Sequence, residues 1–166
     1  MKIEDNILGK KEFDELQTFM MGSNFAWYYS DGIDYEGEEN KFQLTHIFYY
    51  SPAPRSKYFE NIESILEIIS PISLFRIKAN LLTKTPNIVE NVFHVDMNMP
   101  EEKLKQWATS IFYVNTNNGY TEFEDGTKIE SVANRMVSFP ANLKHRGTSC
   151  TDEKIRIVIN FNYFKY

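Results

Sequence analysis

The second half of the chain is a succession of short runs rich in β-branched and aromatic residues, and this pattern constrains the fold more than any other feature. The runs after Pro71 cover residues 74–82, 92–97, 108–115, 120–124, 128–132, 136–139, 144–148 and 155–164. Turn sequences such as Asn117-Asn118-Gly119 and Asp125-Gly126 separate several of them. Many short strands after a few helices predict a mainly β fold, a sandwich or barrel with helices on one outer face.

Two of these runs alternate between apolar and polar residues with a period of two, as expected for strands with one buried face. The first face holds Phe75, Ile77, Ala79, Leu81, Ile155, Ile157, Ile159, Phe161 and Tyr163, and the second holds Arg76, Lys78, Asn80, Arg156, Val158, Asn160 and Asn162. The apolar face requires a helix or a second sheet over it, whereas arginine and asparagine require water or a polar cleft. The alternation therefore favours a barrel with a wet interior over a plain sandwich core.

The first half of the chain predicts the supporting elements. Lys10–Met21 has apolar residues at helical spacing and ends at Gly22, and residues 58–69 form a second such helix that ends before Pro71. Residues 25–30 and Phe42–Tyr50 read as strands, and the acidic stretch 31–40 reads as a loop. We therefore expect one domain over residues 1–166, with helical and strand support in 1–73 and a β core in 74–166.

Composition excludes several classes of protein. The net charge of −5, from 18 basic and 23 acidic residues, argues against broad binding of nucleic acid through its phosphates. No apolar run approaches the roughly 20 residues of a membrane helix, and the first residues lack the basic-then-apolar order of a signal peptide. Cys150 is the only cysteine, which suits a reducing cytoplasm.

The candidate functional residues are His94, Asp96 and His145. His94 and Asp96 are two positions apart, so a strand would direct both side chains to the same side, and His145 from a later run could complete a metal site. Two imidazoles and one carboxylate favour a non-haem Fe(II) oxygenase site, although zinc accepts the same ligands. The alternatives are an ordinary hydrogen-bonded His–Asp pair and a surface His145. The third histidine, His46, lies in an aromatic strand and is expected to be structural.

Arg156 follows His145 on the predicted polar face of the last run. A guanidinium in a cleft can form two parallel hydrogen bonds with a carboxylate, and it is costly there without a partner. An acid that chelates the metal at one end and meets Arg156 at the other would satisfy both groups. The alternative is a salt bridge between Arg156 and a cleft acid such as Glu122.

With these residues the region 75–164 resembles the 2-oxoglutarate- and Fe(II)-dependent oxygenases, on the side nearest to the prolyl 4-hydroxylases. The similar segments, in the order of that family, are Phe93-His94-Val95-Asp96, Ser110-Ile111-Phe112-Tyr113-Val114-Asn115, Gly119-Tyr120-Thr121-Glu122-Phe123, Ser138-Phe139-Pro140, Lys144-His145-Arg146-Gly147, and Arg156 with Asn160. The chain departs from the family at Tyr120, where a second glycine is frequent, and at Asn134-Arg135, where a glycine is common. The overall character of the sequence also resembles that of small oxygenases carried by bacteriophages. This resemblance would place the protein in the cytoplasm of the host cell.

The resemblance implies a double-stranded β-helix (jelly roll) with N-terminal helices on one sheet. It implies Fe(II) held by His94, Asp96 and His145, and 2-oxoglutarate anchored by Arg156. Hydrogen bonds from Tyr113 and Asn160, and more weakly from Asn80, would help to hold that cosubstrate. With O₂, such enzymes convert 2-oxoglutarate to succinate and hydroxylate a substrate C–H bond.

The substrate does not follow from the sequence. A peptidyl side chain such as proline is the leading candidate, and a nucleobase or small molecule is the nearest rival. The other open alternatives are a metal- and 2-oxoglutarate-binding module without catalysis, and a zinc hydrolase. The acidic stretch 31–40 could cover the cleft and prefer a basic peptide, and is otherwise a solvated loop. The aromatic residues Trp27, Tyr28, Tyr35, Tyr49 and Tyr50 could line a groove, and otherwise pack in the core or at its rim.

Overall fold

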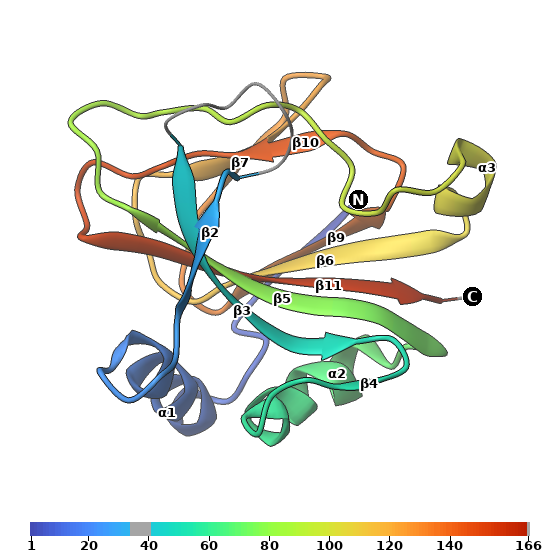
Figure 1. The fold of residues 1–166 in the computed structure, drawn as a ribbon, viewed down its shortest axis with the longest axis horizontal. Helices are drawn as coiled ribbons and strands as arrows, with labels where there is room; N and C mark the ends of the chain where they lie inside the picture. The colour runs from blue at the N-terminus through green and yellow to red at the C-terminus, as the bar shows by residue number, and fades with distance from the viewer. Residues whose placement is uncertain (34–40, 166) are drawn as a thin grey trace.

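A computed structural model describes residues 1–33 and 41–165, and these residues form two β-sheets that face each other (Figure 1). In the large sheet the strand order is β1–β9–β6–β11–β5–β3–β2, with β4 beside β3, and the small sheet has the order β10–β7–β8. The elements are β1 Lys2–Asp5, α1 Lys10–Met21, β2 Tyr28–Asp31, β3 Phe42–Tyr50, β4 Ala53–Pro54, the 3-10 helix η1 Phe59–Ile62, α2 Glu63–Ile69, β5 Ser73–Thr83, α3 Glu101–Leu104, β6 Trp107–Tyr113, β7 Tyr120–Phe123, β8 Lys128–Glu130, β9 Arg135–Pro140, β10 His145–Gly147 and β11 Ile155–Phe164. The mainly β, jelly-roll architecture confirms the predicted fold class.

Helices α1 and α2 cover one face of the large sheet, and the small sheet lies over the other face (Figure 1). Phe13, Leu16 and Met20 of α1 pack into the main core, as their spacing predicts. The second predicted helix begins as η1 and continues as α2, which ends at Ser70 in a left-handed conformation just before Pro71. Because the helices cover only one face of the large sheet, residues on its other face can line a site between the two sheets.

The alternation in β5 and β11 determines which side chains face that site. The apolar positions Ile77, Ala79, Leu81, Ile157, Ile159, Phe161 and Tyr163 belong to the core under the helices. The opposite positions Arg76, Lys78, Asn80, Arg156, Val158 and Asn160 line a cavity between the sheets. The prediction of an apolar face and a polar interior is therefore confirmed for these two central strands, which pair in antiparallel register.

Phe75 is the exception to the predicted alternation. The pairing of β5 with β11 shifts by one residue next to Asn162, so Leu74 rather than Phe75 is opposite Tyr163. This bulge places Leu74 against the main core and Phe75 in a separate cluster with Met97 and Trp107.

Residues 92–97 do not form the predicted strand. The isolated bridges Glu90↔Thr148 and His94↔His145 leave one more residue on the 90–94 side than on the 145–148 side. One extra residue prevents a regular antiparallel ladder, so this segment contacts β10 only irregularly. The sequence also gave no indication of β1, which pairs with β9, or of the single-turn helix α3.

Among the described residues, no helix has the length and apolar character needed to cross a membrane. The acidic stretch 31–40 lies mostly outside the described residues. Its first residue, Asp31, ends strand β2.

Candidate metal centre and adjoining cavity

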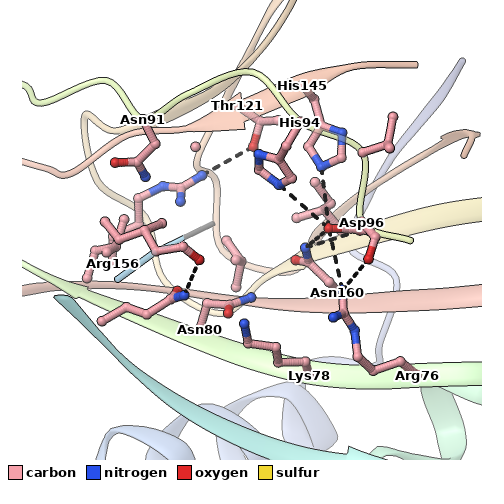
Figure 2. Close-up of a pocket in the computed structure, with 17 residues that line it drawn as sticks. Arg76, Lys78, Asn80, Asn91, His94, Asp96, Thr121, His145, Arg156 and Asn160 are labelled. Carbon is pink, nitrogen blue, oxygen red and sulfur yellow. Dashed lines mark hydrogen bonds and ion pairs between the residues drawn. The ribbon is translucent and has the colours of Figure 1, made fainter. Parts of the chain in front are cut away.

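His94, Asp96 and His145 converge at one end of the cavity between the two sheets (Figure 2). Nε2 of His94 lies 3.7 Å from Oδ1 of Asp96, and Nε2 of His145 lies 3.9 Å from the same oxygen. One ligand atom from each residue lies within 4.8 Å of the other two. The three side chains are at most 10% exposed, so they form a nearly dry cluster.

The backbone orients both histidines in the same way. The N–H of His94 donates to the carbonyl of His145 and the reverse bond also forms, each at 3.0 Å, which places the two residues directly opposite. Nδ1 of His94 donates to the carbonyl of Val92 at 3.0 Å, and Nδ1 of His145 donates to that of Leu143 at 3.2 Å. With the proton held on Nδ1, the lone pair of Nε2 in each ring is directed at Asp96.

The protonation states also suit a metal. Burial is the largest influence on Asp96 and would raise its pKa, but the facing His94, His145 and Arg76 outweigh it and hold the pKa well below its usual range. Burial lowers the pKa of His145, so its ring is neutral at pH 7. An ionised carboxylate and a neutral imidazole are the states in which Asp96 and His145 bind metal.

The cluster is suited to bind a divalent ion. Nε2 of His145 is buried and has no hydrogen-bond partner among the described residues, a costly situation that a metal would relieve. Ligands held at about 2.1 Å by one octahedral ion lie about 3 Å apart, so the present gaps close with side-chain shifts under about 1 Å. The two-histidine, one-carboxylate set is the one that non-haem Fe(II) oxygenases use.

The cavity that adjoins the trio has a volume of about 140 Å³, and Arg156 forms its far end (Figure 2). The Arg156 side chain is buried, with Nε donating to Ser131 Oγ at 2.9 Å and Nη2 donating to Thr121 Oγ1 at 3.2 Å. Among the described residues no carboxylate lies within ion-pair distance of this guanidinium. The alternative pairing with Glu122 is not formed, because Nε and Nη2 of Arg146 bind that carboxylate at 2.8 and 2.6 Å.

The other residues that the sequence nominated take different places around the cavity. Asn80 and Asn160 line it, as predicted from their strand positions (Figure 2). Tyr113 is fully buried, and its hydroxyl donates to Thr121 Oγ1 at 2.9 Å, so Thr121 joins Tyr113 to Arg156. Burial raises the pKa of Tyr113, which keeps its phenol protonated as a donor.

Sequence reasoning did not assign roles to Thr121, Ser131 and Asn162, all of which contact the candidate site residues. The parity of β11 placed Asn162 on the correct face, and that signal could have nominated it. Thr121 and Ser131 come from β7 and from the end of the β8 hairpin, whose approach to Arg156 is set by tertiary structure alone.

Of the remaining aromatic candidates, Trp27 and Tyr49 pack against the main core. Tyr28 and Tyr50 are exposed, and Tyr35 lies outside the described residues. His46 is structural as predicted, because its two ring nitrogens bond the carbonyl of Ala26 and the hydroxyl of Ser56.

Neither protein-family models nor curated proteins match the sequence. Solved structures do match the fold. A prolyl hydroxylase from Trichoplax adhaerens, in complex with a hypoxia inducible factor peptide fragment, aligns with a TM-score of 0.70 and 14% identity, over 98% of this chain and 82% of that chain. The viral collagen prolyl hydroxylase from Paramecium bursaria Chlorella virus-1, as a 2OG complex, aligns with a TM-score of 0.60 and 15% identity, over 99% and 96%.

HygX from Streptomyces hygroscopicus, with nickel and 2-oxoglutarate bound, aligns with a TM-score of 0.64 and 8% identity, over 98% of this chain and 81% of that chain. The chain thus has the fold shared by prolyl hydroxylases and other 2-oxoglutarate- and Fe(II)-dependent oxygenases. The resemblance seen in the sequence motifs is confirmed at the level of the fold.

Proposed function

We propose that this protein is a 2-oxoglutarate- and Fe(II)-dependent dioxygenase that hydroxylates a substrate C–H bond while 2-oxoglutarate is converted to succinate. The observation that carries the proposal is the pairing of two unsatisfied groups in one cavity. At one end lies the His94–Asp96–His145 cluster with its orphaned Nε2 atom, and at the other lies a buried Arg156 without a carboxylate partner among the described residues. A small keto-dicarboxylic acid with a divalent ion matches both ends.

Fe(II), when bound by His94, Asp96 and His145, would supply the redox chemistry that O₂ activation requires. The protein's own contribution is to hold the reacting groups in place and to keep water out. The carbonyls of Val92 and Leu143 fix the imidazoles in the tautomer that presents Nε2. The low pKa of Asp96 keeps its carboxylate ionised throughout the neutral range.

Arg156 would bind the far carboxylate of 2-oxoglutarate. Ser131 and Thr121 accept hydrogen bonds from Nε and Nη2, which fixes the plane of the guanidinium before the acid arrives. The Tyr113 hydroxyl shares Thr121 with Arg156 and lies close to the same end of the cavity. Asn80 and Asn160 face the space between Arg156 and the metal cluster and are proposed to donate to the acid along its length.

The size of the cavity limits how the second substrate can bind. A cavity of roughly 150 Å³ holds one benzene-sized molecule, and drug-sized ligands occupy roughly 300–1,000 Å³. A volume of about 140 Å³ therefore accommodates the cosubstrate and little else. The hydroxylated group must reach the metal from the opening, which suits a side chain presented by a larger molecule, and we propose a peptidyl side chain such as proline.

The same chemistry on a nucleobase or small molecule is the nearest alternative, followed by a binding module without catalysis. A zinc hydrolase is the least favoured, because it gives no role to a buried arginine across the cavity. The cytoplasmic location expected from the single cysteine stays a prediction.

Succinate formation tests the proposal. The parent protein, loaded with Fe(II) and supplied with 2-oxoglutarate and O₂, should release succinate, slowly alone and faster with its substrate. Asp96→Ala, with its fold verified by circular dichroism, should release none above background. Mass spectrometry of peptides and nucleosides from treated lysate should then identify products that have gained one oxygen atom. Succinate formation that is equal in parent and Asp96→Ala, or absent from both with all substrates, would contradict the proposal.

A further inference from the structure

The two carboxylate oxygens of Asp96 have different surroundings. Oδ1 faces the Nε2 atoms of His94 and His145, at 3.7 and 3.9 Å, and Nη2 of Arg76 also lies 3.7 Å from it. Oδ2 accepts a hydrogen bond of 2.8 Å from Nδ2 of Asn162. The amide of Asn160 approaches both oxygens at 3.4 and 3.5 Å, which makes it a much weaker partner. The carboxylate is therefore oriented before any ion binds, with one oxygen toward the histidines and the other toward β11.

Asn162 is itself fixed by its neighbours. Its side chain is fully buried, its Nδ2 also donates to Thr109 Oγ1 at 3.1 Å, and its Oδ1 accepts from Nε of Arg76 at 3.3 Å. Since the guanidinium can only donate and the Asp96 carboxylate can only accept, the amide has one possible orientation. Arg76 also donates through Nη2 to the backbone carbonyl of Asp96 at 3.0 Å, which closes the network. Figure 2 shows Arg76 beside Asp96.

We propose that Asn162 is a positioning residue that restricts Asp96 to binding the metal through Oδ1 alone. This inference rests on the proposed function, because it concerns the same metal. Carboxylates bind ions through one oxygen or through two. An octahedral ion with two imidazoles and one carboxylate oxygen keeps three positions, which a chelating keto acid and O₂ fill completely. A second bond from Asp96 would take one of these positions, and the hydrogen bond from Asn162 to Oδ2 opposes it.

Co(II) is a suitable probe, because its visible absorption spectrum reports the number and kind of its ligands without turnover. Asn162→Leu removes the donor and conserves the side-chain size. Thr109→Val is the matched control, since it removes the other hydrogen bond of the same Nδ2 and leaves the bond to Asp96. We expect Asn162→Leu to bind Co(II) about 10- to 100-fold more weakly and with an altered spectrum. Thr109→Val should match the parent in both, even if its thermal stability falls.

A second measurement uses the parent protein and needs no variant of Asn162. In infrared spectra with ¹³C-labelled aspartate, the separation of the two carboxylate stretches distinguishes binding through one oxygen from binding through two. One aspartate signal should change when Co(II) is added, and that signal should be missing from the spectrum of Asp96→Ala. We expect this signal to have the separation of stretches that indicates binding through one oxygen. The two-oxygen signature, or a folded Asn162→Leu with the parent's affinity and spectrum, overturns the assignment. So does an equal effect of Thr109→Val. A parent that binds no Co(II) contradicts the proposed metal centre itself, which separates that failure from this one.

Discussion

Gly119 lies so close to Arg156 that a Cβ atom at position 119 would be 2.7 Å from Cδ of the arginine. The same Cβ would lie 2.6 Å from the carbonyl oxygen of Ser149, which is backbone and cannot easily move. The close approach allows the β6–β7 turn to pack against the buried guanidinium, and only glycine permits it.

Gly119→Ala should therefore destabilise the protein by about 1–3 kcal/mol, as overpacking does, and weaken 2-oxoglutarate binding by displacing Arg156. Denaturant unfolding and a titration with 2-oxoglutarate measure the two effects. Gly9→Ala is the matched control, because a Cβ at position 9 has no neighbour within 4 Å. If Gly119→Ala has the same stability and the same 2-oxoglutarate affinity as Gly9→Ala, the inferred tight packing of Gly119 against Arg156 is contradicted.

Arg156→Met should abolish tight binding of 2-oxoglutarate without harming the fold. Two charge-assisted hydrogen bonds contribute about 3 kcal/mol or more, which corresponds to at least about a 100-fold loss of affinity. The stability of the ligand-free protein should stay the same or rise, because a buried cation without a carboxylate partner is costly. Arg146→Met is the control on β10 of the small sheet, where the guanidinium pairs with Glu122 and Glu90. It should change stability slightly and leave 2-oxoglutarate affinity intact, and the opposite pattern would contradict the role of Arg156.

Tyr113→Phe should weaken 2-oxoglutarate binding about fivefold, since a hydrogen bond of about 1 kcal/mol that helps to hold Thr121 and Arg156 is lost. Tyr163→Phe is the matched control, because Tyr163 is equally buried and its hydroxyl bonds Ser110 Oγ at 2.9 Å, away from Arg156. Both variants should lose similar stability in thermal melts. Calorimetric titration should show weaker cosubstrate binding only for Tyr113→Phe. Equal 2-oxoglutarate affinities of the two variants would contradict a role for Tyr113 in cosubstrate binding.

The metal-free protein should lose stability as the pH falls below about 6.5. Burial lowers the pKa of both His46 and His145 in the folded state. The unfolded chain takes up protons at these residues near their usual pKa of about 6.5, whereas the folded protein does so only at lower pH, so protonation favours unfolding. Melting temperatures from pH 8 to pH 5 should be level at first and then decline. A melting temperature that rises as the pH falls from 7 to 5 would contradict the predicted direction of the pH dependence of stability.

The sequence predicted most of the fold because its central strands, β5 and β11, are buried on one face and polar on the other. Their alternation indicated both the core and the cavity wall. It could not reveal the bulge at Phe75 or the irregular segment 92–97, since these depend on the register between partners distant in sequence. β1 was missed because its four residues are largely exposed and it forms only by pairing with β9.

The departure at Asn134 has a structural explanation that spacing alone did not provide. Asn134 has a positive φ of 63°, a conformation that glycine favours and asparagine tolerates. Its side chain also bonds the backbone N–H and carbonyl of Leu8, at 2.9 and 2.8 Å. The asparagine thus fixes the N-terminal segment to the β8–β9 connection, a contact between residues far apart in the chain.

Part of the candidate site was also predictable from the sequence. The ligand trio and Arg156 carry distinctive chemistry, and strand parity correctly placed Arg156 on the polar face of β11. His94 and Asp96 meet without the strand that was predicted for residues 92–97. Thr121, Ser131 and Asn162 are ordinary polar residues whose importance lies only in the atoms that they contact, and these contacts come from tertiary structure.

An anaerobic titration of the Fe(II)-loaded protein with 2-oxoglutarate tests the central claim most directly. A keto acid that chelates Fe(II) produces a visible charge-transfer absorption band, so the measurement reports metal and cosubstrate together. We predict a saturable band in the parent, no band in Asp96→Ala, and a band in Arg156→Met only at about 100-fold higher 2-oxoglutarate. A parent without this band, or an Asp96→Ala variant with an undiminished one, would contradict the assignment of His94, Asp96 and His145 as the metal centre.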